Sequence, residues 1–312
     1  MEPSLNRIKP RSWPGAAVPS RTADNIEMIY GLKFVTKFLL GLDYAARNFA
    51  VFPDDTMIVS YPRSGNTWTR FLIANLAHPN EAVTFENIER LIPDTSAISN
   101  RALKKVPRPR LIKSHEYFDH RYPKVVYIVR DPRDVALSYY DFDRKYRHIS
   151  DDYPLERYID EFVAGKLKSS DWGTWGENVG SWISTRGNRP DFLLLRYEEM
   201  LADTPREVAK IAEFLRLSPS LERIAAAIKA SSADRMRELE KLQEHQWVAT
   251  RKHRKDIPFV RTASAGGWKS NLPESCVIKI ESAWGDLMAS LGYPLVSAGI
   301  PEEQIAASSP VS

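Results

Sequence analysis

Four short apolar runs follow one another along the chain, with helix-forming segments between them. The runs are 56–61 (TMIVSY), 110–114 (RLIKS), 124–130 (KVVYIVR) and 192–197 (FLLLRY). Three of them continue without alternating polar positions, which is typical of strands covered on both faces of a parallel sheet. Helical patterns lie over 67–77, 132–146, 156–166, 176–185 and 204–216. The alternation predicts an α/β fold, a single-domain helix–sheet–helix sandwich with a central parallel sheet.

The two ends of the chain lack this pattern. Residues 1–25 are rich in Pro, Ser and Arg without a period, and 301–312 are similar, so we expect flexible ends around one domain over 26–300. The apolar stretch 29–49 is interrupted by charged residues, which predicts an amphipathic helix packed on the domain and no stable membrane insertion. The start of the chain does not resemble a secretory signal, so we expect a cytoplasmic protein.

The net charge and its distribution along the chain bear on the kind of ligand. The 312 residues carry 44 Lys and Arg against 40 Asp and Glu, a surplus too small for a general nucleic-acid binder. The surplus is nevertheless concentrated, with ten basic and three acidic residues over 101–133 and five against one over 251–261. Such runs usually form a solvated face, but two of them favour a small polyanionic ligand. The only cysteine, Cys276, excludes an intrachain disulfide, and no metal is expected.

The first apolar run leads into a turn that looks like a phosphate-binding loop without its lysine. The segment 61–68 reads YPRSGNTW and continues into helix-forming sequence. Strand, tight turn and helix together present backbone N–H groups and a helix N-terminus to an anion, in a topology like that of nucleotide kinases. The signature G-x-x-x-x-G-K-[ST] is absent, however. The loop therefore predicts an anion site and leaves the anion open.

The third run ends in Arg130, at the edge of the sheet where ligands gather in parallel folds. Asp131 is a good N-cap for the next helix, and Asp134 stands where the acid of a capping box would. Ser138 follows two turns into that helix. The guanidinium and the hydroxyl could meet on one phosphate. An arginine paired with a surface carboxylate and an exposed serine is the alternative.

The second run ends in Lys113 and His115, whose side chains project to the same side of an extended backbone. A histidine just past a buried strand and close to a lysine is a credible general base. A structural histidine remains the alternative.

Six segments occur in the order found in the cytosolic-type sulfotransferase family. They are YPRSGNTW, KSH, IVRDPRDVALSYY, WGENVGSW, LLRYEEM and FVRTASAGGWKSNL, and the resemblance covers roughly residues 50–292. It implies an enzyme that moves a sulfonate group from 3′-phosphoadenosine-5′-phosphosulfate (PAPS, which leaves as the bisphosphate PAP) to a hydroxyl or amine of a small-molecule acceptor. No metal is needed, and the loop would hold a phosphosulfate instead of a triphosphate.

The resemblance also implies a role for each matching residue. The loop would wrap the 5′-phosphosulfate, two arginines and one serine would bind the 3′-phosphate, and three further side chains would contact adenine. The implied loop residues are Arg63, Ser64, Gly65, Asn66 and Thr67; the 3′-phosphate residues are Arg130, Ser138 and Arg261, followed by Thr262 and Ala263; the adenine contacts are Trp68, Tyr197 and Ser231. The implied catalytic set is His115 as general base with Arg63, Lys113 and Ser138.

This chain departs from the family at four places. Arg63 replaces a lysine. Because a guanidinium does not give up its proton in a reaction, we exclude a role for Arg63 as general acid and assign it electrostatic stabilisation alone. Thr262 and Ala263 replace Lys and Gly, and Ala233 stands where a phenylalanine is common. The C-terminal dimer motif is only faintly present around Val277 and Glu281, which leaves homodimerisation open.

Two other functions are compatible with parts of the pattern: a non-catalytic nucleotide-binding protein of the same fold and, with less support, a nucleotide kinase. The acceptor is not readable either. The candidate acceptor segments lie near 84–101, 140–153 and 244–260. The stretch YYDFDRKYRHISDDY mixes aromatic residues with both signs of charge, and it suits a phenol, an aminoglycoside or a glycopeptide equally.

Overall fold

The computed structural model describes residues 40, 45–167, 171–243, 245, 253–260 and 263–296. The predictions of flexible ends over 1–25 and 301–312, and the positions of Arg261 and Thr262, lie outside the described residues. The domain limits therefore stay a prediction.

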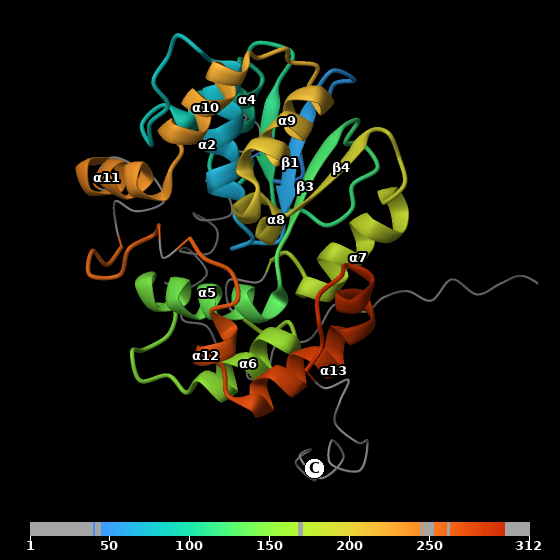
Figure 1. The fold of residues 1–312 in the computed structure, drawn as a ribbon, viewed down its shortest axis with the longest axis vertical. Coiled ribbons are helices and arrows are strands. Elements are labelled where there is room, and N and C mark those ends of the chain that lie inside the picture. Colours follow the sequence, from blue (N-terminus) through green and yellow to red (C-terminus); the bar gives the residue numbers. More distant parts are fainter. Residues whose placement is uncertain are drawn as a thin grey trace, which may run out of the picture.

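A four-stranded parallel sheet forms the centre of the fold (Figure 1), in the order β2-β1-β3-β4. The strands are β1 (Thr56–Ser60), β2 (Leu111–Ser114), β3 (Val125–Val129) and β4 (Phe192–Arg196). Every residue of β1 and β3 is buried, because helices cover both faces of the sheet. All four predicted strands and the predicted fold class are confirmed.

Five helices coincide with the predicted ones, although two end two or three residues early. They are α2 (Asn66–Ala77), α5 (Pro132–Lys145), α6 (Leu155–Val163), α7 (Trp175–Arg186) and α9 (Thr204–Phe214). The other helices are α3 (Ile88–Leu91), α4 (Asn100–Leu103), α8 (Tyr197–Ala202), α10 (Leu221–Ala230), α11 (Ala233–Gln243), α12 (Trp268–Asn271) and α13 (Glu274–Ser290). Several of these are too short to produce a readable apolar period.

Two apolar cores sandwich the sheet. Ile58 of β1 faces a core that includes Phe71 of α2 and Ile211 of α9, while its neighbour Val59 faces a core that includes Phe162 of α6 and Ile280 of α13. Successive side chains of a strand point to opposite faces, which is why adjacent residues of β1 belong to different cores. In Figure 1, α5, α6, α12 and α13 lie together beyond the end of β3 from which α5 departs.

The predicted amphipathic helix over 29–49 falls largely outside the described residues, and its last part is not helical. Residues 45–49 form a turn. The N–H of Ala45 donates to the carbonyl oxygen of Ile98 at 2.9 Å, and that of Ala46 to the carbonyl oxygen of Thr95 at 2.8 Å. Both N–H groups therefore bond to a segment about 50 residues further along the chain, and they do not form the hydrogen bonds of a helix. No described helix is both long and apolar enough to cross a bilayer.

Candidate active site

A cavity of about 1160 Å³ lies where β1, β2 and β3 end, as the rule for parallel sheets predicts. Eleven of the predicted site residues line it: Arg63, Gly65, Asn66, Thr67, Trp68, Lys113, His115, Arg130, Ser138, Tyr197 and Ala263. Ser64 and Ser231 do not belong to the lining, and both side chains are buried.

The loop after β1 is shaped for an anion. Gly65 has φ of +97°, and a Cβ added there would lie 2.5 Å from Cδ2 of Tyr197, so only glycine fits. As the N-cap of α2 it supplies no side-chain hydrogen bond, and the first turn holds no acidic residue. The first N–H groups and the positive end of the helix dipole are therefore available to a bound anion.

Two buried polar atoms of this region lack a hydrogen-bond partner among the described residues. They are the hydroxyl of Ser64 and Oδ1 of Asn66. Buried polar groups are normally hydrogen-bonded, and an unsatisfied one often marks a place for a missing partner. Asn66 lines the cavity whereas Ser64 does not, so the buried Ser64 hydroxyl is not placed to contact a ligand in the cavity.

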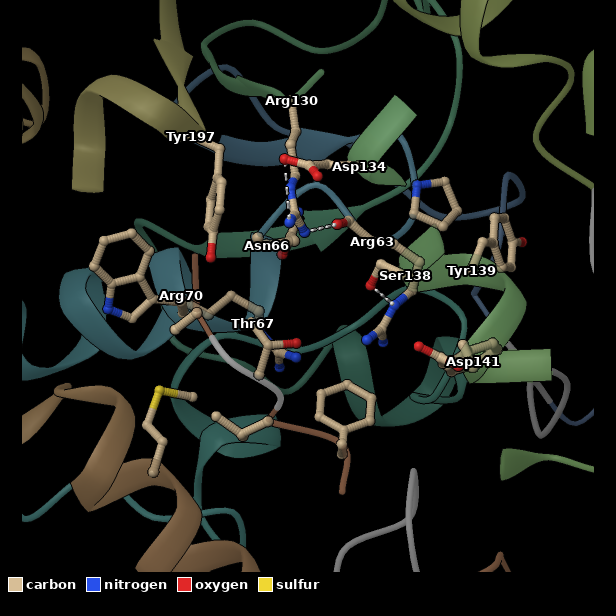
Figure 2. A pocket seen from close by; sticks show the side chains of 18 of the residues that line it. Arg63, Asn66, Thr67, Arg70, Arg130, Asp134, Ser138, Tyr139, Asp141 and Tyr197 are labelled. Atoms are coloured by element: carbon tan, nitrogen blue, oxygen red, sulfur yellow. Dashed lines mark hydrogen bonds and ion pairs between the residues drawn. The ribbon is translucent and has the colours of Figure 1, made fainter. Parts of the chain in front are cut away.

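Two arginines from different strand ends converge beside the loop (Figure 2). Nε of Arg63 donates to the hydroxyl of Ser138 at 3.2 Å, and Nη1 of Arg130 donates to the carbonyl oxygen of Arg63 at 3.3 Å. The Arg130 guanidinium also lies over the Tyr197 ring, 4.5 Å from its centroid, and its buried Nε has no partner among the described residues. Ser138 is only 6% exposed. Nη2 of Arg130 lies 3.9 Å from Oδ2 of Asp134, but that carboxylate is only 3% exposed. The alternative of an arginine paired with a surface carboxylate and an exposed serine is therefore wrong.

The predicted capping box at the start of α5 is wrong. Asp131 caps the helix as expected, accepting from the N–H of Arg133. The carboxylate of Asp134 instead accepts from the N–H groups of Gly266 at 2.7 Å and Trp268 at 2.9 Å. Asp134 thus anchors the late loop that follows Arg261, the second arginine that the family resemblance implies for the 3′-phosphate.

Ala263, in that late loop, has φ of +49°, a left-handed conformation that favours glycine. The family's glycine would adopt it without strain, so the replacement by alanine has a visible structural consequence. Arg130 contacts the same loop, since its Nη2 donates to the carbonyl oxygen of Ser264 at 3.1 Å.

His115 is held in one tautomer. Its Nδ1 lies 2.7 Å from the carbonyl oxygen of Ser60, an acceptor, so Nδ1 carries the proton and Nε2 the lone pair. Burial, and then the charge of Lys113, lower the pKa of His115 to about 3 in the ligand-free protein, while the carboxylate of Asp94 acts in the opposite direction and raises this pKa. The imidazole is therefore neutral at physiological pH, as a general base requires.

Lys113 makes an ion pair that the sequence does not reveal. Its Nζ contacts Oδ2 of Asp94, and both side chains are largely buried. Burial lowers the pKa of Lys113, while the carboxylate of Asp94 counteracts that shift. Asp94 lies 19 positions earlier in a segment without a motif, so only its place in the broad candidate segment 84–101 pointed to it.

Two of the three predicted adenine contacts line the cavity, and the third does not. Trp68 and Tyr197 pack edge to face with ring centroids 5.8 Å apart, and both line the cavity. Ser231 lies behind the wall, where its hydroxyl accepts from Nδ2 of Asn75 at 3.1 Å. The next residues, Ser232 and Ala233, face the cavity instead.

All three candidate acceptor segments reach the same cavity. Asp94 comes from the first, Tyr140 and His148 from the second and Phe259 from the third. Tyr140 is half-buried, and Nδ1 of His148 lies 2.9 Å from Oδ1 of Asp143. Aromatic rings and charged groups therefore share this side of the cavity.

The described residues contain no group of three or more His, Cys, Asp or Glu side chains that could hold a metal ion.

Val277 and Glu281, the residues of the faint dimer motif, are both buried within this chain, and Oε1 of Glu281 accepts from Nη1 of Arg133 at 2.6 Å.

Known proteins share both the sequence pattern and the fold. Residues 53–292 match the family model described as the sulfotransferase domain. Sulfotransferase 1B1 of Mus musculus is 30% identical over 267 residues, which cover 79% of this chain and 86% of that protein. Sulfotransferase 1B1 of Canis lupus familiaris is 28% identical over 262 residues, covering 79% and 87%. The structure of mouse sulfotransferase SULT7A1 complexed with PAP has a TM-score of 0.63 at 23% identity, covering 84% of this chain and 91% of that one. The chain thus belongs to the cytosolic-type sulfotransferase family, as the order of its motifs predicts, and is a sulfotransferase.

Proposed function

We propose that the protein transfers a sulfonate group from PAPS to a hydroxyl or amine of a small-molecule acceptor, with His115 as general base. The observation that carries this proposal is one cavity that holds the uncapped N-terminus of α2, Arg63, Arg130 and His115 together. Bound PAPS supplies the sulfonate and leaves as PAP. A cavity of about 1160 Å³ is large enough for a nucleotide and a small acceptor side by side.

The residues present fit such a ligand. The first N–H groups of α2 suit the 5′-phosphosulfate. Arg130, whose Nε has no partner among the described residues, suits the 3′-phosphate. Trp68 and Tyr197 offer rings for adenine. Without a lysine, the loop does not suit the triphosphate of a nucleotide kinase.

The chemistry required of the protein is mostly electrostatic. Transfer of a sulfonate, like that of a phosphoryl group, has a loose transition state in which negative charge grows on the leaving oxygen. Arg63 and Lys113 would stabilise that charge, and Nε2 of His115 would take the proton of the attacking hydroxyl as the sulfur–oxygen bond to the 5′-phosphate breaks. Ser138 holds the Arg63 guanidinium through its hydroxyl.

The experiment supplies the protein with radiolabelled PAPS or, separately, with ATP and magnesium, against phenols, steroids and amino sugars. Release of PAP in step with acceptor labelling is the expected result. Tight PAP binding with every acceptor inert would favour the non-catalytic nucleotide-binding alternative, and phosphate transfer from ATP would favour a kinase. The identity of the acceptor is left to this panel, and a cytoplasmic location stays a prediction from the sequence.

A further inference from the structure

The end of β2 carries an added layer of backbone that positions a carboxylate against Lys113. The N–H of Lys113 donates to the carbonyl oxygen of Pro93 at 2.8 Å, and the N–H of Thr95 donates to the carbonyl oxygen of Lys113 at 3.1 Å. These two bonds form a parallel bridge between Asp94 and Lys113, on the edge of β2 away from β1. The segment is thereby fixed along the strand end.

The carboxylate of Asp94 is fixed on both sides. Oδ1 accepts from the N–H of Ser96 at 2.9 Å and from its hydroxyl at 2.6 Å, and Oδ2 accepts from Nζ of Lys113. The N–H of Asp94 donates to Oε2 of Glu89 at 3.0 Å. Such a carboxylate cannot swing away from the ammonium without breaking several hydrogen bonds.

The surroundings of Lys113 are charged but balanced. Four charged or titratable groups act on the Lys113 ammonium: the carboxylates of Asp94 and Glu89, the guanidinium of Arg70 and the imidazole of His115. Arg70 and Glu89 also pair with each other at 3.1 Å. Burial, and to a smaller extent Arg70, lowers the pKa of Lys113, and Asp94 is the strongest group that opposes this shift. An isolated buried ammonium tends to lose its proton, whereas a paired one keeps it.

We propose that Asp94 is a positioning residue for sulfonate transfer: it fixes the Lys113 ammonium at the end of β2, beside His115, and keeps it charged. The inference rests on the proposed function, because Lys113 acts in the reaction only if a sulfonate is transferred in this cavity. Asp94 itself need not contact either substrate.

The test compares the pH dependence of kcat/KM in the wild type, Asp94→Asn and Asp94→Glu. Loss of the carboxylate makes Lys113 deprotonate at lower pH, so the basic limb of the Asp94→Asn profile shifts down by about one pH unit or more, and Asp94→Glu restores much of it. Asp160→Asn, which removes an exposed partner of Lys279, serves as the matched control and leaves the profile in place. An equal loss of rate at every pH, or no change, would overturn the proposal.

A second readout does not depend on turnover. The lysines are labelled by reductive ¹³C-methylation, the Lys113 signal is assigned from its absence in Lys113→Arg, and its titration is followed by NMR. The midpoint falls in Asp94→Asn if the ion pair keeps Lys113 charged, and an unchanged midpoint contradicts the proposal. An inactive wild type whose Lys113 titration still responds to Asp94→Asn would refute sulfonate transfer alone, while PAP affinity measured by calorimetry checks that the cavity is intact.

Discussion

Nε of Arg63 donates to the hydroxyl of Ser138 at 3.2 Å, which joins the loop after β1 to the second turn of α5 across the cavity. The two residues are 75 positions apart in the sequence, and Figure 2 shows them turned toward each other. The guanidinium also lies 5.0 Å from the ring centroid of Phe142 and 4.9 Å from that of Phe259. The arginine that replaces the family's lysine is therefore held in place on several sides.

Removing this charge is expected to slow transfer. Arg63→Met keeps a long side chain but loses the cation, so kcat should fall about 10²- to 10³-fold, as when one stabilising donor is removed from other active sites. Arg63→Lys retains the charge and should keep more activity than Arg63→Met. Initial rates at saturating PAPS measure the effect, with exposed Arg101→Met as control. Equal losses in Arg63→Lys and Arg63→Met would show that charge is not the decisive property.

His115→Ala is expected to separate catalysis from cofactor binding. Turnover should fall about 10²- to 10⁴-fold because the general base is lost, while PAP affinity stays close to that of the wild type. Rates and calorimetry on the same preparation give both quantities, and His120→Ala, which changes an exposed histidine, is the control. A parallel loss of PAP affinity and turnover would contradict the assigned role.

The lowered pKa of His115 also predicts how stability depends on pH. The pKa is about 3 in the folded protein and 6.5 in a model peptide, so the unfolded chain binds this proton more readily. The resulting stabilisation is complete above pH 6.5 and is lost as the pH falls toward 3. Between pH 7 and pH 5 the wild type should therefore lose more free energy of unfolding than His115→Gln, by on the order of 1 kcal/mol. Urea denaturation at both values measures it, and equal losses would show that the histidine is not buried as described.

Gly65→Ala is expected to damage both the loop and its binding site. The new Cβ would have to displace the Tyr197 ring and adopt φ of +97°, so the Tm should fall and PAP binding should be lost. Gly266 provides a matched comparison, since it has φ of +78° but open space around its Cβ position. Thermal unfolding should therefore show a smaller effect for Gly266→Ala. Similar Tm losses would mean that backbone strain, and not the clash with Tyr197, dominates.

The sequence predicts the sheet and the cradle because both rest on local signals. Continuous apolar runs define buried strands, and the chain places Arg63, Lys113 and Arg130 at or just after strand ends, which meet at one edge of a parallel sheet. Local signals fail where a partner is distant. Asp134 looks like a capping residue, but its carboxylate accepts from N–H groups over 130 positions away.

Other features depend on tertiary packing that no motif records. The role of Asp94 arises from a bridge to β2, and Ser231 is turned behind the cavity wall by its hydrogen bond to Asn75. The left-handed Ala263 is a third case, since only the comparison with the family's glycine suggested that the position is special.

Calorimetric titration of PAP and of 5′-AMP into the wild type and Arg130→Ala tests the central claim most directly, because the two ligands differ only in the 3′-phosphate. The wild type should bind PAP more tightly than 5′-AMP, and Arg130→Ala should remove most of that difference while changing 5′-AMP affinity little, since a buried charge-assisted contact is lost only for PAP. Equal affinities of the wild type for the two nucleotides, or no binding of either, would contradict a cradle built for the bisphosphate.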